Sequence, residues 1–247
     1  MYNTYESIIN CIREVTINMQ IDINPNSDLI RVIPPSSLIK IPKGMPQKGS
    51  RFQETMLMYS SAIKTVRTKI EVLNDELSIR NCRNPIEMIK SRVKKAESIV
   101  EKLNRRGLNV TIDSMIENVY DIAGIRVICS FVDDIYDVAN MLRSQDDIRV
   151  INTKDYIRNP KDNGYRSYHM IIETPVFFSD KKINVKVEIQ IRTIAMDFWA
   201  SLDHQLKYKK NIENADVIVA ELKDCADVIA ATDDRMRNIR RILEKKI

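Results

Sequence analysis

The chain has 247 residues, of which 44% are hydrophobic and 30% charged, so it is long enough to bury a core without disulfides or a structural metal. Lys and Arg outnumber Asp and Glu by 39 to 34, which favours an anionic ligand such as a nucleotide or RNA. No apolar run approaches the roughly 20 residues that span a bilayer. The N-terminus lacks the pattern of a signal peptide, and we expect a cytoplasmic protein with no membrane partner.

The first 50 residues differ in composition from the rest of the chain. They hold five of the eight prolines, which predicts an N-terminal extension or linker over residues 1–50 and a main domain over residues 51–247. A weak helical pattern runs from Tyr5 to Ile21, and no function is assigned to it. The four cysteines form no CxxC pair, so we expect reduced core thiols rather than a zinc site or a disulfide framework; they are Cys11, Cys82, Cys129 and Cys225.

Two long apolar stripes with helical spacing predict amphipathic helices, one from Met56 to Leu77 and one from Ile218 to Leu243. Each could pack within the chain or form a homo-oligomer interface. Between them, alternating apolar and polar residues predict strands at 125–131 and 185–191, with further strands at 148–153 and 166–173 and a helix at 133–143. The fold class is therefore α+β, a mixed β-sheet flanked by helices.

A basic segment from Lys90 to Lys95 precedes Ser98 and Glu101, which have the spacing of a capping box. We expect a helix from Ser98 to Gly107, with Lys102 and its basic neighbours on one face. If the segment before it is extended, Arg92 and Lys94 point the same way, beside the partial positive charge of the helix start. The pattern fits a cationic cradle for phosphates, and a solvated basic helix end is the alternative.

Two carboxylates lie on or next to predicted strands. Asp121 precedes the strand that carries Arg126, and Glu188 lies mid-strand on a polar face with Gln190 and Arg192. Carboxylates on neighbouring strands could hold Mg²⁺, which prefers oxygen ligands and shares its coordination with phosphates. A strand face that is simply exposed to water is the alternative.

The segment from Lys161 to His169 combines Asn163, a glycine turn and Tyr165. Tyrosine can stack on a base and asparagine can bind a base edge, although an exposed hairpin turn would give the same pattern. A structural role is the simpler interpretation of His169 alone, and more so of His204.

Five ordered motifs together resemble the synthetase domain of the RelA/SpoT family. They are Arg92-Val-Lys94, Ser98-Ile with Lys102, Asp121-Ile-Ala-Gly-Ile-Arg126, Asn163-Gly-Tyr-Arg-Ser-Tyr-His169 and Glu188-Ile-Gln-Ile-Arg-Thr193. The sequence Phe198-Trp-Ala with Asp203-His204 is similar to the RelQ-type small alarmone synthetases, and the resemblance runs from about Arg51 to near the C-terminus.

The resemblance implies transfer of the β,γ-pyrophosphate of ATP to the ribose 3′-hydroxyl of GDP or GTP, with release of AMP, on a nucleotidyltransferase-like fold that commonly forms homotetramers. It implies that Asp121 and Glu188 bind Mg²⁺ and that Glu188 also helps to deprotonate the hydroxyl. It assigns ATP binding to Arg92, Lys94, Ser98, Lys102 and Arg126, and GDP or GTP binding to Lys161, Asn163, Tyr165, His169 and Gln190.

Long relatives hydrolyse the alarmone in a domain that needs several histidines and a His-Asp pair, whereas this sequence has two histidines and neither precedes Asp. We therefore expect no hydrolysis by that route. Alarmone or single-stranded RNA regulates some small synthetases, but Met88 and Asp197 depart from the expected pattern, so such control is left open. The preferred acceptor is also open, and DNA is not an expected partner.

Three other functions fit the sequence less well. A nucleotidyltransferase would need a third acidic ligand near Asp121, where Asp-x-Asp spacing is missing. A catalytically idle nucleotide- or RNA-binding module gains nothing from retaining Asp121 and Glu188. A helical interaction scaffold leaves the polar strand face unexplained.

Overall fold

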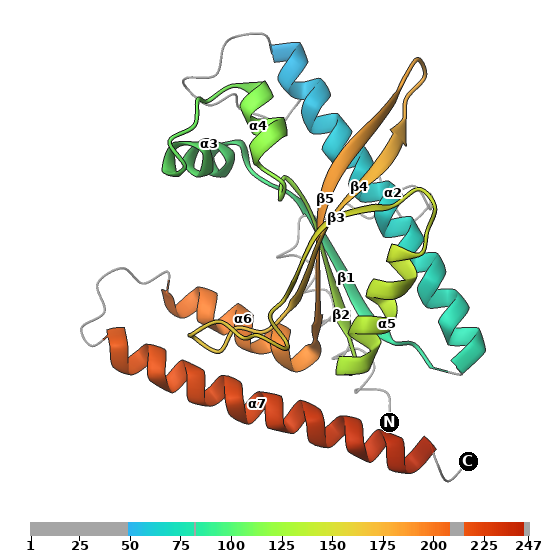
Figure 1. Ribbon diagram of the computed structural model, residues 1–247, viewed down its shortest axis with the longest axis vertical. Coiled ribbons are helices and arrows are strands. Elements are labelled where there is room, and N and C mark those ends of the chain that lie inside the picture. Colours follow the sequence, from blue (N-terminus) through green and yellow to red (C-terminus); the bar gives the residue numbers. More distant parts are fainter. Residues whose placement is uncertain (1–48, 82, 208–214, 245–247) are drawn as a thin grey trace, which may run out of the picture. The chain divides into compact units, whose positions relative to one another are not determined.

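The computed structural model describes residues 49–81, 83–207 and 215–244, and their order of elements is that of an α+β domain (Figure 1). The predicted helix at Tyr5 to Ile21, most of the predicted extension over residues 1–50 and two of the cysteines, Cys11 and Cys82, lie outside these residues. The helices are α2 (Gly49–Asn81), α3 (Ala96–Arg105), α4 (Ile112–Asn118), α5 (Val132–Arg143), α6 (Ile194–Lys207) and α7 (Ala215–Glu244). The strands are β1 (Ile86–Val93), β2 (Ala123–Cys129), β3 (Arg149–Asp155), β4 (Tyr168–Phe177) and β5 (Lys182–Thr193).

The five strands form one mixed sheet in the order β1-β2-β5-β4-β3. Only β2 and β5 run parallel, and the other neighbouring pairs are antiparallel. This confirms the predicted fold class. The polar segment at Lys90 to Lys95, predicted only conditionally to be extended, is mostly the edge strand β1.

One face of the sheet is buried beneath α2 and α5, which Figure 1 shows on the same side of it. In β5 the side chains of Val185, Val187, Ile189 and Ile191 point into this core, and each is at most 2% exposed. Because successive side chains of a strand point to opposite faces, the polar residues between them lie on the other face. That face, with α3 and α4 toward one end and α6 toward the other, carries the candidate site.

The two long helices bury their surfaces differently. The apolar stripe of α2 packs against the sheet within the chain, and Tyr59, Val66 and Ile70 are at most 2% exposed. The predicted stripe of α7 is largely exposed at its C-terminal half, including Met236 and Ile239. Intramolecular packing therefore accounts for the stripe of α2 but not for the C-terminal half of the stripe of α7.

The buried face of α7 instead uses small and charged side chains. Ala226 is 4% exposed, Asp233 accepts a hydrogen bond from Thr193 Oγ1 at 2.5 Å, and Arg240 forms an ion pair with Asp133 at 2.5 Å. Long-range polar pairs of this kind leave no periodic apolar signal in the sequence.

The structure corrects two local predictions. Helix α3 begins at Ala96 with Lys95 as its N-cap, so Ser98 lies inside the first turn and the Ser98–Glu101 capping box is wrong. Of the two described cysteines, Cys129 is buried, and burial raises the pKa of its thiol, whereas Cys225 is exposed rather than in the core. Among the described residues no helix is long and apolar enough to cross a membrane.

Candidate active site

Strand register brings the motif residues into two rows across the polar face of the sheet. One row runs from Arg92 through Gly124 to Glu188, and the next runs from Lys90 through Arg126 and Gln190 to His169. Residues that are 21 to 64 positions apart in the sequence thus become neighbours. Gly124 has no side chain, so it leaves a gap between Arg92 and Glu188.

A cavity of about 190 Å³ opens over these rows. Arginine and lysine side chains of β1 and β2 supply its positive charge, while two carboxylates, Asp121 and Glu188, supply the negative charge. Its lining residues are Lys90, Ser91, Arg92, Asp121, Gly124, Ile125, Arg126, Glu188 and Gln190. A mixed site of this kind suits a polyanion that is bound together with a cation.

Asp121 is held between two ammonium groups. Lys94 Nζ lies 2.9 Å from its Oδ2 atom and Lys102 Nζ lies 2.7 Å from its Oδ1 atom. Burial would raise the pKa of the Asp121 carboxyl, but the hydrogen bonds from Lys102 and Lys94 outweigh burial and hold this pKa below its usual value. The carboxyl is therefore ionised at neutral pH. Lys94 and Lys102 both extend into the site from residues that are not part of the sheet.

Glu188 is paired with His169 and Gln190. His169 Nδ1 lies 3.4 Å from Glu188 Oε1, and Gln190 Nε2 donates to Glu188 Oε2 at 3.0 Å. Burial alone would raise the pKa of the Glu188 carboxyl, yet the contact with His169 and the bond from Gln190 lower it, while the nearby charge of Asp121 acts against them. Both carboxyls thus carry charge at neutral pH and interact with each other.

Oxygen donors from β5 and from the turn that precedes β2 fit a small hard cation such as Mg²⁺, which keeps several ligand positions for water and phosphate oxygens. The described residues contain no group of three or more His, Cys, Asp or Glu side chains that could hold a metal by themselves. Asp121 and Glu188 therefore suit a metal that arrives with a phosphate ligand, and not a closed structural site.

The loop between β3 and β4 carries the other predicted residues, Lys161, Asn163 and Tyr165. Its turn is closed by a hydrogen bond from Gly164 N to Lys161 O at 2.8 Å, with Gly164 at φ +82°, a conformation that favours glycine. The Asn163 side chain accepts from Tyr165 N at 3.3 Å, and Lys161 Nζ lies 5.0 Å from the centre of the Tyr165 ring. Asn163 is thus engaged in shaping the turn.

Tyr165 connects this loop to the sheet. Its hydroxyl lies 2.8 Å from His169 Nε2 and accepts from Arg192 Nη2 at 2.5 Å. The Arg192 guanidinium also lies 5.1 Å from the centre of the tyrosine ring. These contacts fix the Tyr165 ring next to His169, the last residue of the row that runs through Gln190.

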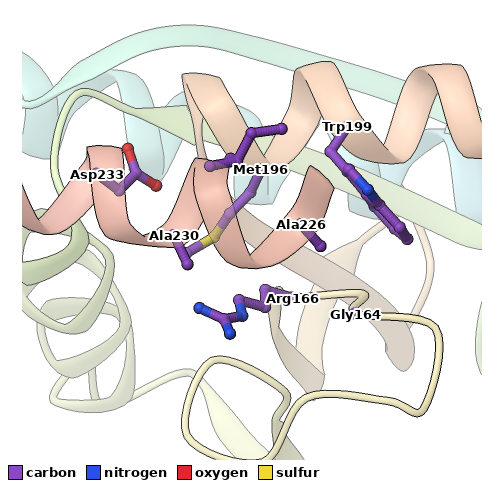
Figure 2. A pocket seen from close by; sticks show the side chains of 8 residues that line it. Gly164, Arg166, Met196, Trp199, Ala226, Ala230 and Asp233 are labelled. Carbon is purple, nitrogen blue, oxygen red and sulfur yellow. The ribbon is translucent and has the colours of Figure 1, made fainter. Parts of the chain in front are cut away.

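The same loop rests on the C-terminal helix. Figure 2 shows Gly164 and Arg166 facing Ala226 of α7 and Trp199 of α6 around a small pocket. A Cβ atom placed on Gly164 would come within 2.5 Å of Ala226 Cβ, and Arg166 Nη2 forms an ion pair with Asp227 at 3.1 Å. The close approach requires glycine in the loop and a small residue in the helix.

Sequence reasoning missed the importance of two residues, Arg192 and Asp197. Arg192 was placed on the polar face, but it is 4% exposed and donates to Ser167, Asp197, Tyr165 and Gln190. The sequence shows Asp197 only as a departure from the pattern of the RelQ-type synthetases. The position of Arg192 at the end of a run of alternating polar residues is the one signal in the sequence. No nearby residue indicates which side chains it contacts. Helix α6 includes His204, whose side chain lies outside the described residues.

Comparisons with known proteins agree with the site. A family model described as "Region found in RelA / SpoT proteins" matches residues 91–213. The GTP pyrophosphokinase YwaC of Bacillus subtilis is 46% identical over 190 residues, 77% of this chain and 90% of that protein. The chain belongs to the RelA/SpoT family. A second Bacillus subtilis member, the GTP pyrophosphokinase YjbM, is 34% identical over 77% of this chain and 89% of its own.

Solved structures of the RelA/SpoT family share the fold. The crystal structure of small alarmone synthetase 2 from Bacillus subtilis is 45% identical, with a TM-score of 0.69 over 77% of this chain and 98% of that chain. Small alarmone synthetase 1 from the same organism, bound to its product pppGpp, is 32% identical, with a TM-score of 0.71 over 79% and 99%. Its AMPCPP-bound structure is 31% identical, with a TM-score of 0.66 over 79% and 99%. The family resemblance that the five motifs indicate is thereby confirmed.

Proposed function

We propose that the protein is a GTP pyrophosphokinase that transfers the β,γ-pyrophosphate of ATP to the ribose 3′-hydroxyl of GDP or GTP. The observation that carries the proposal is the pair of ionised carboxylates, Asp121 and Glu188, inside a cavity lined by cationic side chains. The names of the Bacillus relatives, with 46% and 34% identity, support the same reaction.

The donor nucleotide occupies the side of the cavity formed by β1 and β2, next to α3, whose Lys102 contacts Asp121. Arg92 and Arg126 lie on adjacent strands and both line the cavity, so their planar guanidinium groups are suited to hold the adenine between them. Lys94 and Lys102 supply positive charge for the phosphates, and Ser98 in the first turn of α3 is the accompanying hydroxyl. The AMPCPP complex of a relative supports an adenine nucleotide as ligand.

The acceptor nucleotide lies against the loop between β3 and β4. Tyr165 offers its ring to the guanine base, and Lys161 and His169 face the phosphates and the ribose. Asn163 is the residue assigned to the base edge, and Gln190 links Glu188 to Arg192 beside the ring. The pppGpp complex of a relative supports a guanine nucleotide here.

The reaction needs a base and charge compensation. The 3′-oxygen forms a bond to the β-phosphorus of ATP, the bond from that phosphorus to the α,β-bridging oxygen breaks, and AMP leaves. Glu188 accepts the hydroxyl proton, while Lys94 and Lys102 offset the negative charge of the phosphates. Mg²⁺ held by Asp121 and Glu188 would neutralise phosphate charge and lower the pKa of the hydroxyl.

We also propose a compartment, a domain division and an assembly for this enzyme. The compartment is the cytoplasm, because the substrates are nucleotides of the cytoplasm. Residues 51–247 are the proposed synthetase domain, and residues 1–50 are an extension. Association of several copies is supported by apolar side chains of α7 that remain exposed in the single chain, among them Val228, Met236 and Ile239. The homotetramer is the assembly that the family resemblance implies. Light scattering of the full chain measures the mass directly, and regulation by alarmone or single-stranded RNA is tested by adding each to the assay.

The decisive experiment follows the labelled phosphate. Protein is incubated with Mg²⁺, γ-³²P-ATP and either GDP or GTP, and the nucleotides are resolved. We expect a labelled guanosine product that is lost in Glu188→Gln and on chelation of the metal, and that is kept in Glu87→Gln, a matched change at an exposed glutamate of β1. Folded protein that binds nucleotides or RNA but gives no product with either acceptor would identify a binding module.

A further inference from the structure

One carboxylate, that of Asp197, contacts three cationic side chains from three strands. Asp197 lies in the first turn of α6 and is 8% exposed. Its Oδ2 atom is 3.3 Å from Lys90 Nζ, and its Oδ1 atom is 3.1 Å from Arg126 Nη1 and 3.3 Å from Arg192 Nη1. A single oxygen is thus shared between two guanidinium groups.

Charge balance explains why a carboxylate is needed at this position. Arg192 is buried, and a buried charge without a partner is strongly unfavourable. Burial and the positive charge of Arg192 both lower the pKa of the Arg126 guanidinium, while the charge of Asp197 acts in the opposite direction. Asp197 is the counter-ion that allows Arg126 and Arg192 to lie close together.

The partners of Asp197 belong to different parts of the site. Lys90 and Arg126 line the cavity on the proposed ATP side. Arg192 donates to the hydroxyl of Tyr165, on the proposed acceptor side, and to Gln190. Asp197 is the link between the two groups of side chains.

We propose that Asp197 is a positioning residue that couples binding of ATP to binding of the guanine nucleotide. The inference rests on the proposed function. Neither Asp197 nor Arg192 contacts a substrate in the proposed function. The two nucleotide sites are coupled through Asp197 Oδ1, the oxygen that Arg126 and Arg192 share.

The direction of the coupling follows from this shared oxygen. When an adenine nucleotide binds Arg126, the hydrogen bond from Arg126 to Asp197 Oδ1 weakens. Asp197 Oδ1 then accepts mainly from Arg192. Arg192 is then more firmly oriented, and so is the Tyr165 ring to which it donates. The acceptor should therefore bind more tightly when the ATP side is filled.

Equilibrium binding tests the coupling without turnover. The ATP analogue AMPCPP has a methylene group in place of the α,β-bridging oxygen, so the bond that breaks in the reaction is blocked. Calorimetry measures the Kd of GDP with the full chain and Mg²⁺, with and without saturating AMPCPP. In the wild type we expect AMPCPP to lower the Kd of GDP about fivefold or more, and in Asp197→Asn we expect a change within about twofold.

Two further variants make the result specific. Asp147→Asn is a matched change at a half-exposed ion pair with Lys69, outside the site, and it should keep the wild-type coupling. Tyr165→Phe keeps the aromatic ring but removes the hydroxyl that accepts from Arg192, so it should lose the coupling while the Kd of AMPCPP alone stays unchanged. If Asp197→Asn does not fold, Tyr165→Phe decides the question.

The outcomes separate this inference from the proposed function. Coupling that is absent in the wild type, or that persists in folded Asp197→Asn, overturns the inference even when labelled product forms. A wild type that binds neither nucleotide and forms no product overturns the proposed function and the inference with it. Loss of coupling in Asp197→Asn and Tyr165→Phe, with retention in Asp147→Asn, supports the role of Asp197.

Discussion

The Nδ1 atom of His169 lies 3.4 Å from the Oε1 oxygen of Glu188 across the paired strands β4 and β5. Burial raises the pKa of the Glu188 carboxyl, but the contact with His169 and the hydrogen bond from Gln190 bring it below the usual value. Because the pKa is depressed in the folded state, the stability from these contacts is present above the ordinary glutamate pKa and lost as the pH falls through the lowered one.

Replacing the imidazole should change the pH dependence of catalysis. In His169→Phe a planar aromatic ring is kept but the contact with Glu188 is lost, so burial dominates and the pKa of Glu188 rises. We expect the acidic limb of the kcat/KM profile to move to higher pH. The measurement is a pH–rate profile from about pH 3, below the ordinary pKa of glutamate, to about pH 9. An acidic limb at the same pH in variant and wild type would contradict the role of His169.

The carboxylate between Lys94 and Lys102 should be required for turnover. In Asp121→Asn the shape is preserved but a negative charge and a metal ligand are lost, so we expect kcat to fall about a hundredfold or more and half-maximal activity to need more Mg²⁺. Steady-state rates over a series of Mg²⁺ concentrations test both effects. Asp113→Asn, in an exposed ion pair with Arg51, is the matched control, and equal Mg²⁺ dependence in all three proteins would remove Asp121 from the metal site.

The sequence predicted those parts of the fold whose signal is local. Strands β2 and β5 alternate apolar and polar residues because one face is buried beneath α2 and α5, and this alternation also showed that Glu188 lies on the polar face. The start of α3 was misplaced because Ser98 and Glu101 match a capping box by spacing alone. The cap is Lys95, which has an extended backbone and makes no side-chain capping bond.

The sequence predicts a residue of the candidate site only where a motif lies on or next to a strand that can be recognised from its alternating pattern. Asp121, Arg126 and Glu188 were found because each lies on or next to a recognisable strand. Asp197 meets its partners Lys90 and Arg126 across 107 and 71 positions of sequence, and no periodicity records such contacts. For the same reason the packing of α7 through Ala226 could not be read from its apolar stripe.

Enlarging Ala226 should affect acceptor binding selectively. Gly164, in the loop between β3 and β4, lies against this residue, so the longer side chain of Ala226→Leu would displace the turn that carries Tyr165. We expect the KM for GDP or GTP to rise about tenfold, with the KM for ATP within about twofold. Kinetics with each nucleotide varied in turn measure the difference. Ala220→Leu, at an exposed position of the same helix, should change neither constant, and a parallel rise in both constants for Ala226→Leu would refute the selective effect.

Removing the Arg92 side chain should weaken ATP binding. Arg92 is exposed on the edge strand β1 and pairs with Gly124 of the neighbouring strand. It lines the cavity together with Arg126, which lies two residues further along that strand. A guanidinium group can stack on adenine, whereas an ammonium group supplies only charge. We therefore expect the KM for ATP to rise about tenfold or more in Arg92→Ala, with little recovery in Arg92→Lys.

Initial rates at varied ATP and saturating acceptor measure this effect, and the KM for the acceptor serves as an internal reference. Arg149→Ala removes an exposed arginine from β3, at the opposite edge of the same sheet, and should leave the KM for ATP unchanged. Full recovery in Arg92→Lys would show that charge, and not stacking, is the contribution of Arg92. An unchanged ATP dependence in Arg92→Ala would place the adenine elsewhere in the cavity.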